Sequence, residues 1–239
     1  MISARFAGSL AAMQLFLLFF LLTLVTTMWA KGKYRKAYDE ELKNIAASGL
    51  TGADLARMIL QARGIEVVEI VRGKGLFADY YDPEHKRLFL APQHYGGSTF
   101  TALGIAAHEA GHVLQHRDGH QPLQWRISAI RATIFLSLPI AALGLFMMIV
   151  PGMAKMGVYL LAFGWSLVAG YNLVTLPVEL DASERARQVL DSIRPFRNLD
   201  ERLGVERMMR AASAAYVDGV FTVISWLGSW FLPSSDSEN

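Results

Sequence analysis

Four long apolar stretches constrain this chain more than any other feature of its sequence. They cover residues 9–30, 132–151, 157–176 and 211–232. A helix that crosses the hydrocarbon core of a bilayer needs about 20 consecutive apolar residues, and each stretch is long enough. A composition of 53% hydrophobic and only 18% charged residues agrees with membrane insertion. The predicted fold class is a mainly α membrane protein with about four transmembrane helices.

The basic residues predict how these helices are oriented. Four of them lie between residues 31 and 36, directly after the first stretch, and Arg126 and Arg131 precede the second. Because basic residues near a span tend to stay on the cytoplasmic side, both termini are expected outside, with residues 31–131 and 177–210 in the cytoplasm. A cleaved signal peptide is the alternative for the first stretch, but its apolar region is too long and no small-residue cleavage pattern follows it.

These boundaries divide the chain into six segments. We expect a first transmembrane helix (1–30), a cytoplasmic region (31–131), a transmembrane hairpin (132–176), a cytoplasmic helix (177–210), a fourth transmembrane helix (211–232) and a polar tail (233–239).

The cytoplasmic region 31–131 is predicted to contain a small α+β layer. Apolar residues at helical spacing predict a short amphipathic helix within residues 51–64. Residues 65–71 and 87–91 have strand character, and an Asp-Pro pair within residues 80–85 favours a turn between them.

The residue types in the chain exclude several kinds of chemistry. There is no cysteine, so disulfides, cysteine nucleophiles and zinc–thiolate sites are excluded, and a metal ion must be held by His, Asp or Glu. The net charge of +2 is too small to indicate nucleic-acid binding.

The segment from His108 to His112 reads His-Glu-Ala-Gly-His. A helix capped by Ser98 or Thr99 places the two histidines on one face, about 6 Å apart along the axis, so that both imidazoles can reach one zinc ion. Glu109 points to the adjacent side, where it can accept a proton from water. This is the H-E-x-x-H arrangement of zinc peptidases.

A third zinc ligand is not found on the same helix. His116 lies about 9 Å along the axis from a zinc ion between the two histidines, which is too far. The longer zinc-peptidase pattern fails as well, because Gln115 and Asp118 occupy the positions of its glycine and third histidine. Glu179, two residues after Pro177, is an alternative ligand, although carboxylates also favour helix N-termini for electrostatic reasons.

Three segments together resemble the YugP-type family of membrane zinc peptidases. They are residues 81–83 (Tyr-Asp-Pro), 106–112 (Ala-Ala-His-Glu-Ala-Gly-His) and 173–183 (Leu-Val-Thr-Leu-Pro-Val-Glu-Leu-Asp-Ala-Ser). The resemblance covers nearly the whole chain. It implies a neutral zinc metallopeptidase of the bacterial cytoplasmic membrane, with the catalytic layer of a zinc peptidase on the cytoplasmic side, Zn²⁺ as cofactor, His108, His112 and Glu179 as ligands and Glu109 as base.

The chain is similar, more remotely, to the HtpX and CAAX-endopeptidase families. Those families have an Asp four residues after the ligand Glu, whereas this chain has Ser183. Ser183 and Asp181 are therefore the candidates for orienting a ligating imidazole from behind.

The expected reaction is hydrolysis of peptide bonds in cytoplasmic or membrane-proximal protein segments. An extended substrate is expected along the strand at residues 87–91, because main-chain pairing recognises peptides of varied sequence. Tyr216 and Asn172 are the first candidates for the oxyanion donor, and His94 and Tyr95 are further ones. Asp218 is an ionisable residue within an apolar stretch, which gives it either a functional or an interfacial role.

Two other classes of protein remain as alternatives. A catalytically idle zinc-binding membrane scaffold would not need Glu109, and a transporter would need more polar residues within its spans than Asn172 and Asp218. The predicted partners are a protein or peptide substrate and the lipid bilayer; no nucleic acid is expected, and the sequence does not identify a membrane partner protein.

Overall fold

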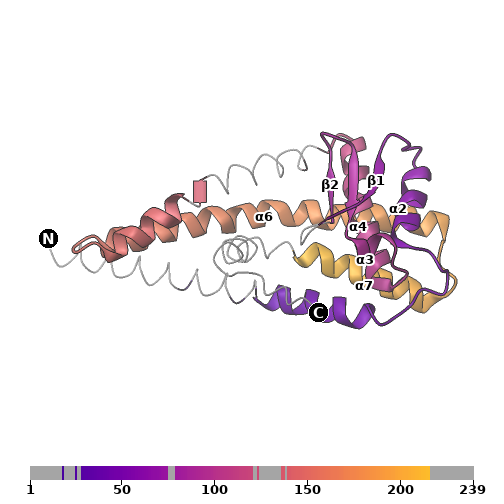
Figure 1. The fold of residues 1–239 in the computed structure, drawn as a ribbon, viewed down its shortest axis with the longest axis horizontal. Helices are drawn as coiled ribbons and strands as arrows, with labels where there is room; N and C mark the ends of the chain where they lie inside the picture. Colours follow the sequence, from indigo (N-terminus) through magenta and orange to yellow (C-terminus); the bar gives the residue numbers. More distant parts are fainter. Residues whose placement is uncertain are drawn as a thin grey trace, which may run out of the picture. The chain divides into compact units, whose positions relative to one another are not determined.

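A computed structural model describes residues 28–74, 79–120, 136–137 and 139–215, together with Leu18, Val25 and Leu123. These residues belong to two compact units. The first lies within residues 1–30, 128–173 and 217–239, and the second within residues 31–127 and 174–216. Figure 1 labels the helices and strands.

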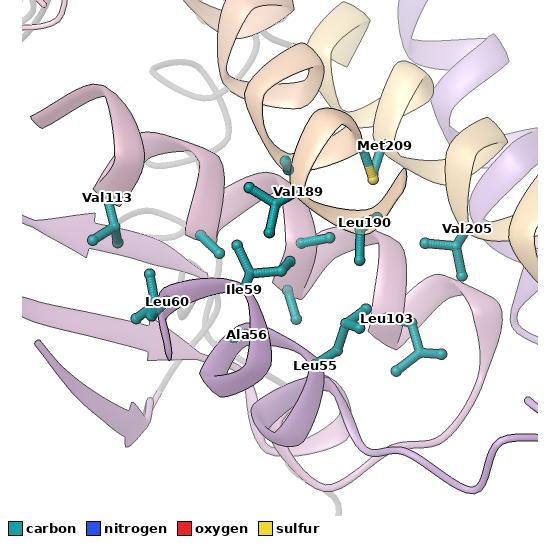
Figure 2. Close-up of a cluster of buried hydrophobic side chains, with 14 of the residues drawn as sticks. Leu55, Ala56, Ile59, Leu60, Leu103, Val113, Val189, Leu190, Val205 and Met209 are labelled. Carbon is teal, nitrogen blue, oxygen red and sulfur yellow. The ribbon is translucent and has the colours of Figure 1, made fainter. Parts of the chain in front are cut away.

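The core of the second unit is formed by four helices. They are α2 (Gly52–Gln61), α4 (Phe100–Arg117), the C-terminal half of α6 (Ala154–Ile193) and α7 (Leu199–Ala215). In Figure 2 apolar side chains of all four helices point into one cluster, which includes Leu55, Ile59, Leu103, Val189, Leu190, Val205 and Met209. Helix α4 is the centre of this packing, because every residue from Phe100 to Gln115 is buried.

Local signals explain where α2 and α4 begin. The Thr51 side chain accepts a hydrogen bond from the backbone N–H of Asp54, and the Asp54 carboxylate accepts one from the backbone N–H of Thr51, which completes a capping box. The Thr99 side chain caps α4 by accepting from the N–H of Ala102. The predicted helices within residues 51–64 and from Thr99 to about residue 116 are confirmed.

A three-stranded sheet accompanies the helices of the second unit. Its order is β1 (Glu69–Arg72), β3 (Arg87–Leu90) and β2 (Tyr80–Asp82), with β1 parallel and β2 antiparallel to β3. The predicted strands are present, but residues 80–82, expected in a turn, form β2. Because β3 is paired on both sides, the prediction that residues 87–91 offer a free edge to a substrate is wrong.

Helices α4 and α6 approach each other closely at Gly111. A Cβ atom added to Gly111 would lie 2.1 Å from the carbonyl oxygen of Ala182, so only glycine fits at this contact.

Helix α6 passes through Pro177 without interruption, whereas the sequence suggested that a new helix begins there. Proline removes one backbone N–H from a helix interior, and α6 tolerates this loss.

In the first unit, residues 139–149 form a helix that packs antiparallel to the beginning of α6. The chain reverses at residues 150–153, where Gly152 has a φ of +81°, a value that suits glycine. Gly144 and Gly157 allow close packing, since a Cβ at Gly157 would lie 2.5 Å from the Gly144 carbonyl oxygen.

The predicted fold class needs a correction. The protein is mainly α with a small sheet, but among the described residues no helix is both long enough and apolar enough to cross a membrane, so about four transmembrane helices are not supported. The stretch 157–176 is part of a longer helix, α6, whose C-terminal half carries charged residues and packs into the second unit. The stretches 9–30 and 211–232 lie mostly outside the described residues.

The contact at Gly111 leads to a prediction about stability. We expect Gly111→Ala to destabilise the protein by about 1–3 kcal/mol, because α4 and α6 must move apart to admit the methyl group. Gly32→Ala is the control, since Gly32 lies in a helix and has no atom within 4 Å of an added Cβ. Thermal unfolding of both variants tests this, and an unchanged melting temperature for Gly111→Ala would contradict the packing argument.

Candidate metal centre

Two histidines of α4 and one glutamate of α6 meet in the interior of the second unit. His108 and His112 lie one helical turn apart, with ring centroids 5.0 Å from each other, and both are almost fully buried. Glu179 reaches them from α6 and has no exposed surface. All three residues were predicted as metal ligands from sequence, and the structure brings them together.

The distances among these side chains suit a single metal ion. The Oε2 atom of Glu179 lies 3.1 Å from Nε2 of His108 and 3.4 Å from Nε2 of His112. One ligand atom from each residue lies within 4.8 Å of the other two. Two imidazoles and one carboxylate are the ligands that a catalytic zinc ion takes from proteins, with a fourth position left for water or substrate.

The second ring nitrogen of His108, Nδ1, supports this assignment. Nδ1 of His108 lies 2.8 Å from Oγ of Ser183, whose hydroxyl group donates to the Met209 carbonyl oxygen. Ser183 therefore accepts a hydrogen bond from His108, which places the proton on Nδ1 and leaves the Nε2 lone pair directed at Glu179. The donor set and the tautomer of His108 thus fit a zinc ion.

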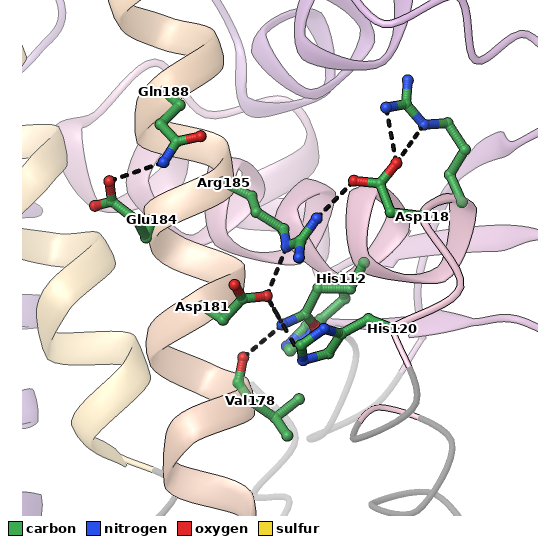
Figure 3. Close-up of polar contacts among 10 residues, drawn as sticks. His112, Asp118, His120, Val178, Asp181, Glu184, Arg185 and Gln188 are labelled. Atoms are coloured by element: carbon green, nitrogen blue, oxygen red, sulfur yellow. Dashed lines mark hydrogen bonds and ion pairs between the residues drawn. The ribbon is translucent and has the colours of Figure 1, made fainter.

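Asp181 is linked to the ligand His112 through Gln115. Its Oδ2 atom accepts hydrogen bonds from Nε2 of Gln115 and from Nε of Arg185, and Arg185 also donates to Asp118 at the end of α4 (Figure 3). Burial favours the neutral form of Asp181, but the bonds from Arg185 and Gln115 outweigh it and hold the pKa of this carboxyl below its usual value. Asp181 is therefore a charged link between α6 and the end of α4.

Gln115 was missed as a site residue from sequence. Its Oε1 atom lies 2.9 Å from Nδ1 of His112. Gln115 therefore contacts Nδ1 of His112 in the same way that Ser183 contacts Nδ1 of His108. The sequence offered one signal, which is its position three residues after His112 on the same helix face.

Glu109 is buried next to the ligands but does not belong to the ligand cluster found among the described residues. Its charge acts on the phenol of Tyr34. Burial raises the pKa of Tyr34, and Tyr38, Asp79 and Glu109 raise it further, so this phenol stays protonated near Glu109.

The remaining histidines that the sequence singled out are engaged elsewhere. His116 pairs through Nδ1 with the hydroxyl group of Tyr81 at 2.7 Å, and burial, followed by Asp82, raises the pKa of Tyr81 to about 12. His94 is buried between Asp79 and Tyr38. Tyr95 packs at the border of the core cluster.

Three other residues that were candidates from sequence have side chains that the structure does not describe. Tyr216 and Asp218 fall beyond the described residues, and of Asn172 only the backbone is described. Their expected roles stay predictions.

A buried cluster of two histidines and one carboxylate between two packed helices has the ligand types of a metallopeptidase zinc site. The chain belongs to the family described as "Putative neutral zinc metallopeptidase", which it matches over residues 15–234. It is 33% identical over 204 residues to the "Putative membrane protease YugP" of Bacillus subtilis (strain 168), an alignment that covers 85% of this chain and 89% of the relative. No solved structure matches it. The expected family and the zinc cofactor are thereby confirmed.

The cluster predicts which substitutions abolish metal binding. Wild-type protein should contain about one zinc ion per chain. His108→Ala or Glu179→Ala should reduce this content well below one, because the two protein ligands that remain are too few to hold the ion. Elemental analysis after gel filtration measures the content. His116→Ala should keep its zinc, and full zinc content in Glu179→Ala would remove Glu179 from the ligand set.

Proposed function

We propose that this chain is a zinc-dependent endopeptidase that hydrolyses peptide bonds in protein segments near a membrane. The observation that carries the proposal is the buried cluster of His108, His112 and Glu179 with Glu109 beside it. Membership in a zinc metallopeptidase family and the description of the relative as a membrane protease support the same reaction class.

The residues around the cluster have separate tasks in this mechanism. A bound zinc ion supplies a Lewis acid that polarises the scissile carbonyl group and lowers the pKa of water. Glu109 takes a proton from the attacking water and passes it to the leaving amine. Ser183 holds the imidazole of His108 so that its Nε2 atom keeps facing the cluster.

The substrate is proposed to be a protein or peptide in an extended conformation. The outer edge of β2 is the place we favour for it, because β2 pairs only with β3 among the described strands and lies against α4. Main-chain pairing at such an edge binds peptides of varied sequence.

The proposed location is the cytoplasmic membrane of a bacterium, with the site on the cytoplasmic side. The name of the relative supports membrane association, and the basic residues between positions 31 and 36 support the side. The helical hairpin of the first unit also exposes many large apolar side chains, which suits contact with lipid. They include Leu143, Leu145, Phe146, Ile149, Met156 and Phe163.

The first test concerns Glu109. If Glu109 is the base, Glu109→Gln should bind zinc as the wild type does and lose cleavage of an unfolded protein substrate by about 100-fold or more. Glu184→Gln is a matched control, because Glu184 is exposed on α6 and pairs with Arg187 away from the cluster. Zinc-loaded wild type and Glu109→Gln with equal, negligible cleavage would instead favour the catalytically idle scaffold.

A second test concerns the membrane. Leu145→Lys combined with Phe146→Lys should reduce the fraction of protein that floats with lipid vesicles, because each lysine costs about 2.5–3.5 kcal/mol in an apolar environment. Both side chains are about 60% exposed, as is expected of a lipid contact. Val67→Lys, at an exposed position of the second unit, should float as the wild type does. Equal flotation of the double variant and the wild type would contradict a role of the hairpin.

A further inference from the structure

Gln115 is a fully buried polar residue at the metal centre. It lies on α4 three residues after His112 and has no exposed surface. A buried amide costs free energy unless its oxygen and both its N–H bonds find partners, so its contacts are expected to be specific.

The contacts of Gln115 fix the orientation of its amide group. The Nε2 atom donates to the carbonyl oxygen of Val178 and to Oδ2 of Asp181, both at 2.7 Å. Both partners accept, because Val178 offers a carbonyl oxygen and Oδ2 of Asp181 also receives a hydrogen bond from Arg185. The two donors therefore point to α6, and Oε1 necessarily faces His112.

This orientation determines the tautomer of His112. The Oε1 atom of Gln115 can only accept, so Nδ1 of His112, at 2.9 Å, carries the proton. In the neutral imidazole the lone pair is then on Nε2, which lies 3.4 Å from Oε2 of Glu179, as a metal ligand requires.

The same side chain also fixes the position of the third ligand. Val178 and Asp181 lie on either side of Glu179 along α6, and Gln115 holds both from α4. A single amide group thus connects the imidazole of His112 to the segment that carries Glu179. This amide cannot turn without losing its two hydrogen bonds to α6.

We propose that Gln115 is a positioning residue, which sets the tautomer of His112 and the register of α4 against α6 at the metal ligands. The inference rests on the zinc site of the proposed function. It adds that zinc affinity depends on a residue that does not touch the metal ion.

The substitution Gln115→Met tests this with little change of volume. The side chain keeps its length and loses its three hydrogen bonds. Val178 keeps its place in α6, and Asp181 keeps its bond to Arg185, so the fold retains its other contacts. Loss of a partner behind a ligand typically weakens metal binding by about 10–100-fold, and we expect a loss in this range.

The measurement is the zinc dissociation constant from competition with a chelator, together with the melting temperature of the metal-free protein. Gln188→Met is the matched control, because Gln188 is exposed on α6 and bonds only to Glu184 among the contacts described. It should bind zinc as the wild type does. If Gln115→Met does not fold, Gln115→Asn is the second variant to measure. The same loss of zinc affinity is expected for it, because the asparagine side chain is too short to reach His112 and α6 together.

The outcomes separate the inference from the proposed function. Wild-type zinc affinity in Gln115→Met with a lowered melting temperature would mean that Gln115 only stabilises the fold, and would overturn the inference while leaving the peptidase proposal intact. A weakened affinity with little change in metal-free melting temperature would support it. A wild-type protein that takes up no zinc would overturn both.

Discussion

The close approach of α4 and α6 is the constraint on which the metal centre depends. The two helices meet at Gly111 and Ala182, where the backbone of α6 occupies the space of a missing Cβ atom. This contact lies between His108 and His112 on one helix and next to Glu179 and Ser183 on the other. Because the ligands come from two helices, their distances follow from helix packing, and a core of apolar residues holds that packing in place.

Around the ligands, buried and half-buried polar groups form a continuous network. Ser183 holds His108 and is itself bonded to Met209 and Ser213, so α7 contributes to the site without supplying a ligand. On the other side, the network runs from His112 through Gln115 and Asp181 to Arg185. Buried polar groups that are fully bonded specify one arrangement, because any other would leave a donor or acceptor without a partner. The site is therefore held by the whole second unit.

The sequence predicts those parts that follow from local patterns. Helices α2 and α4 carry their caps and apolar periodicity in contiguous residues, and the spacing of His108 and His112 defines a metal-binding face. Long-range features were not predictable in this way. Strand β2 forms only because β3 pairs with it, α6 continues through Pro177 because its flanking residues are packed, and Gln115 gains its role from residues 63 and 66 positions away. The length of the apolar stretches predicted transmembrane spans. It did not indicate that the stretch 157–176 continues as a helix that carries charged residues and packs into the second unit.

The glycine between the two histidines has a consequence for protein engineering. In a sequence pattern, the residues between Glu109 and His112 count as variable, yet here the second of them is fixed by a neighbouring backbone 2.1 Å from where its Cβ would stand. The five-residue motif is therefore not a portable unit. Transplanted to another scaffold, it would bring two ligands and a carboxylate, but the third ligand would need an incoming helix that can approach as closely as α6 does.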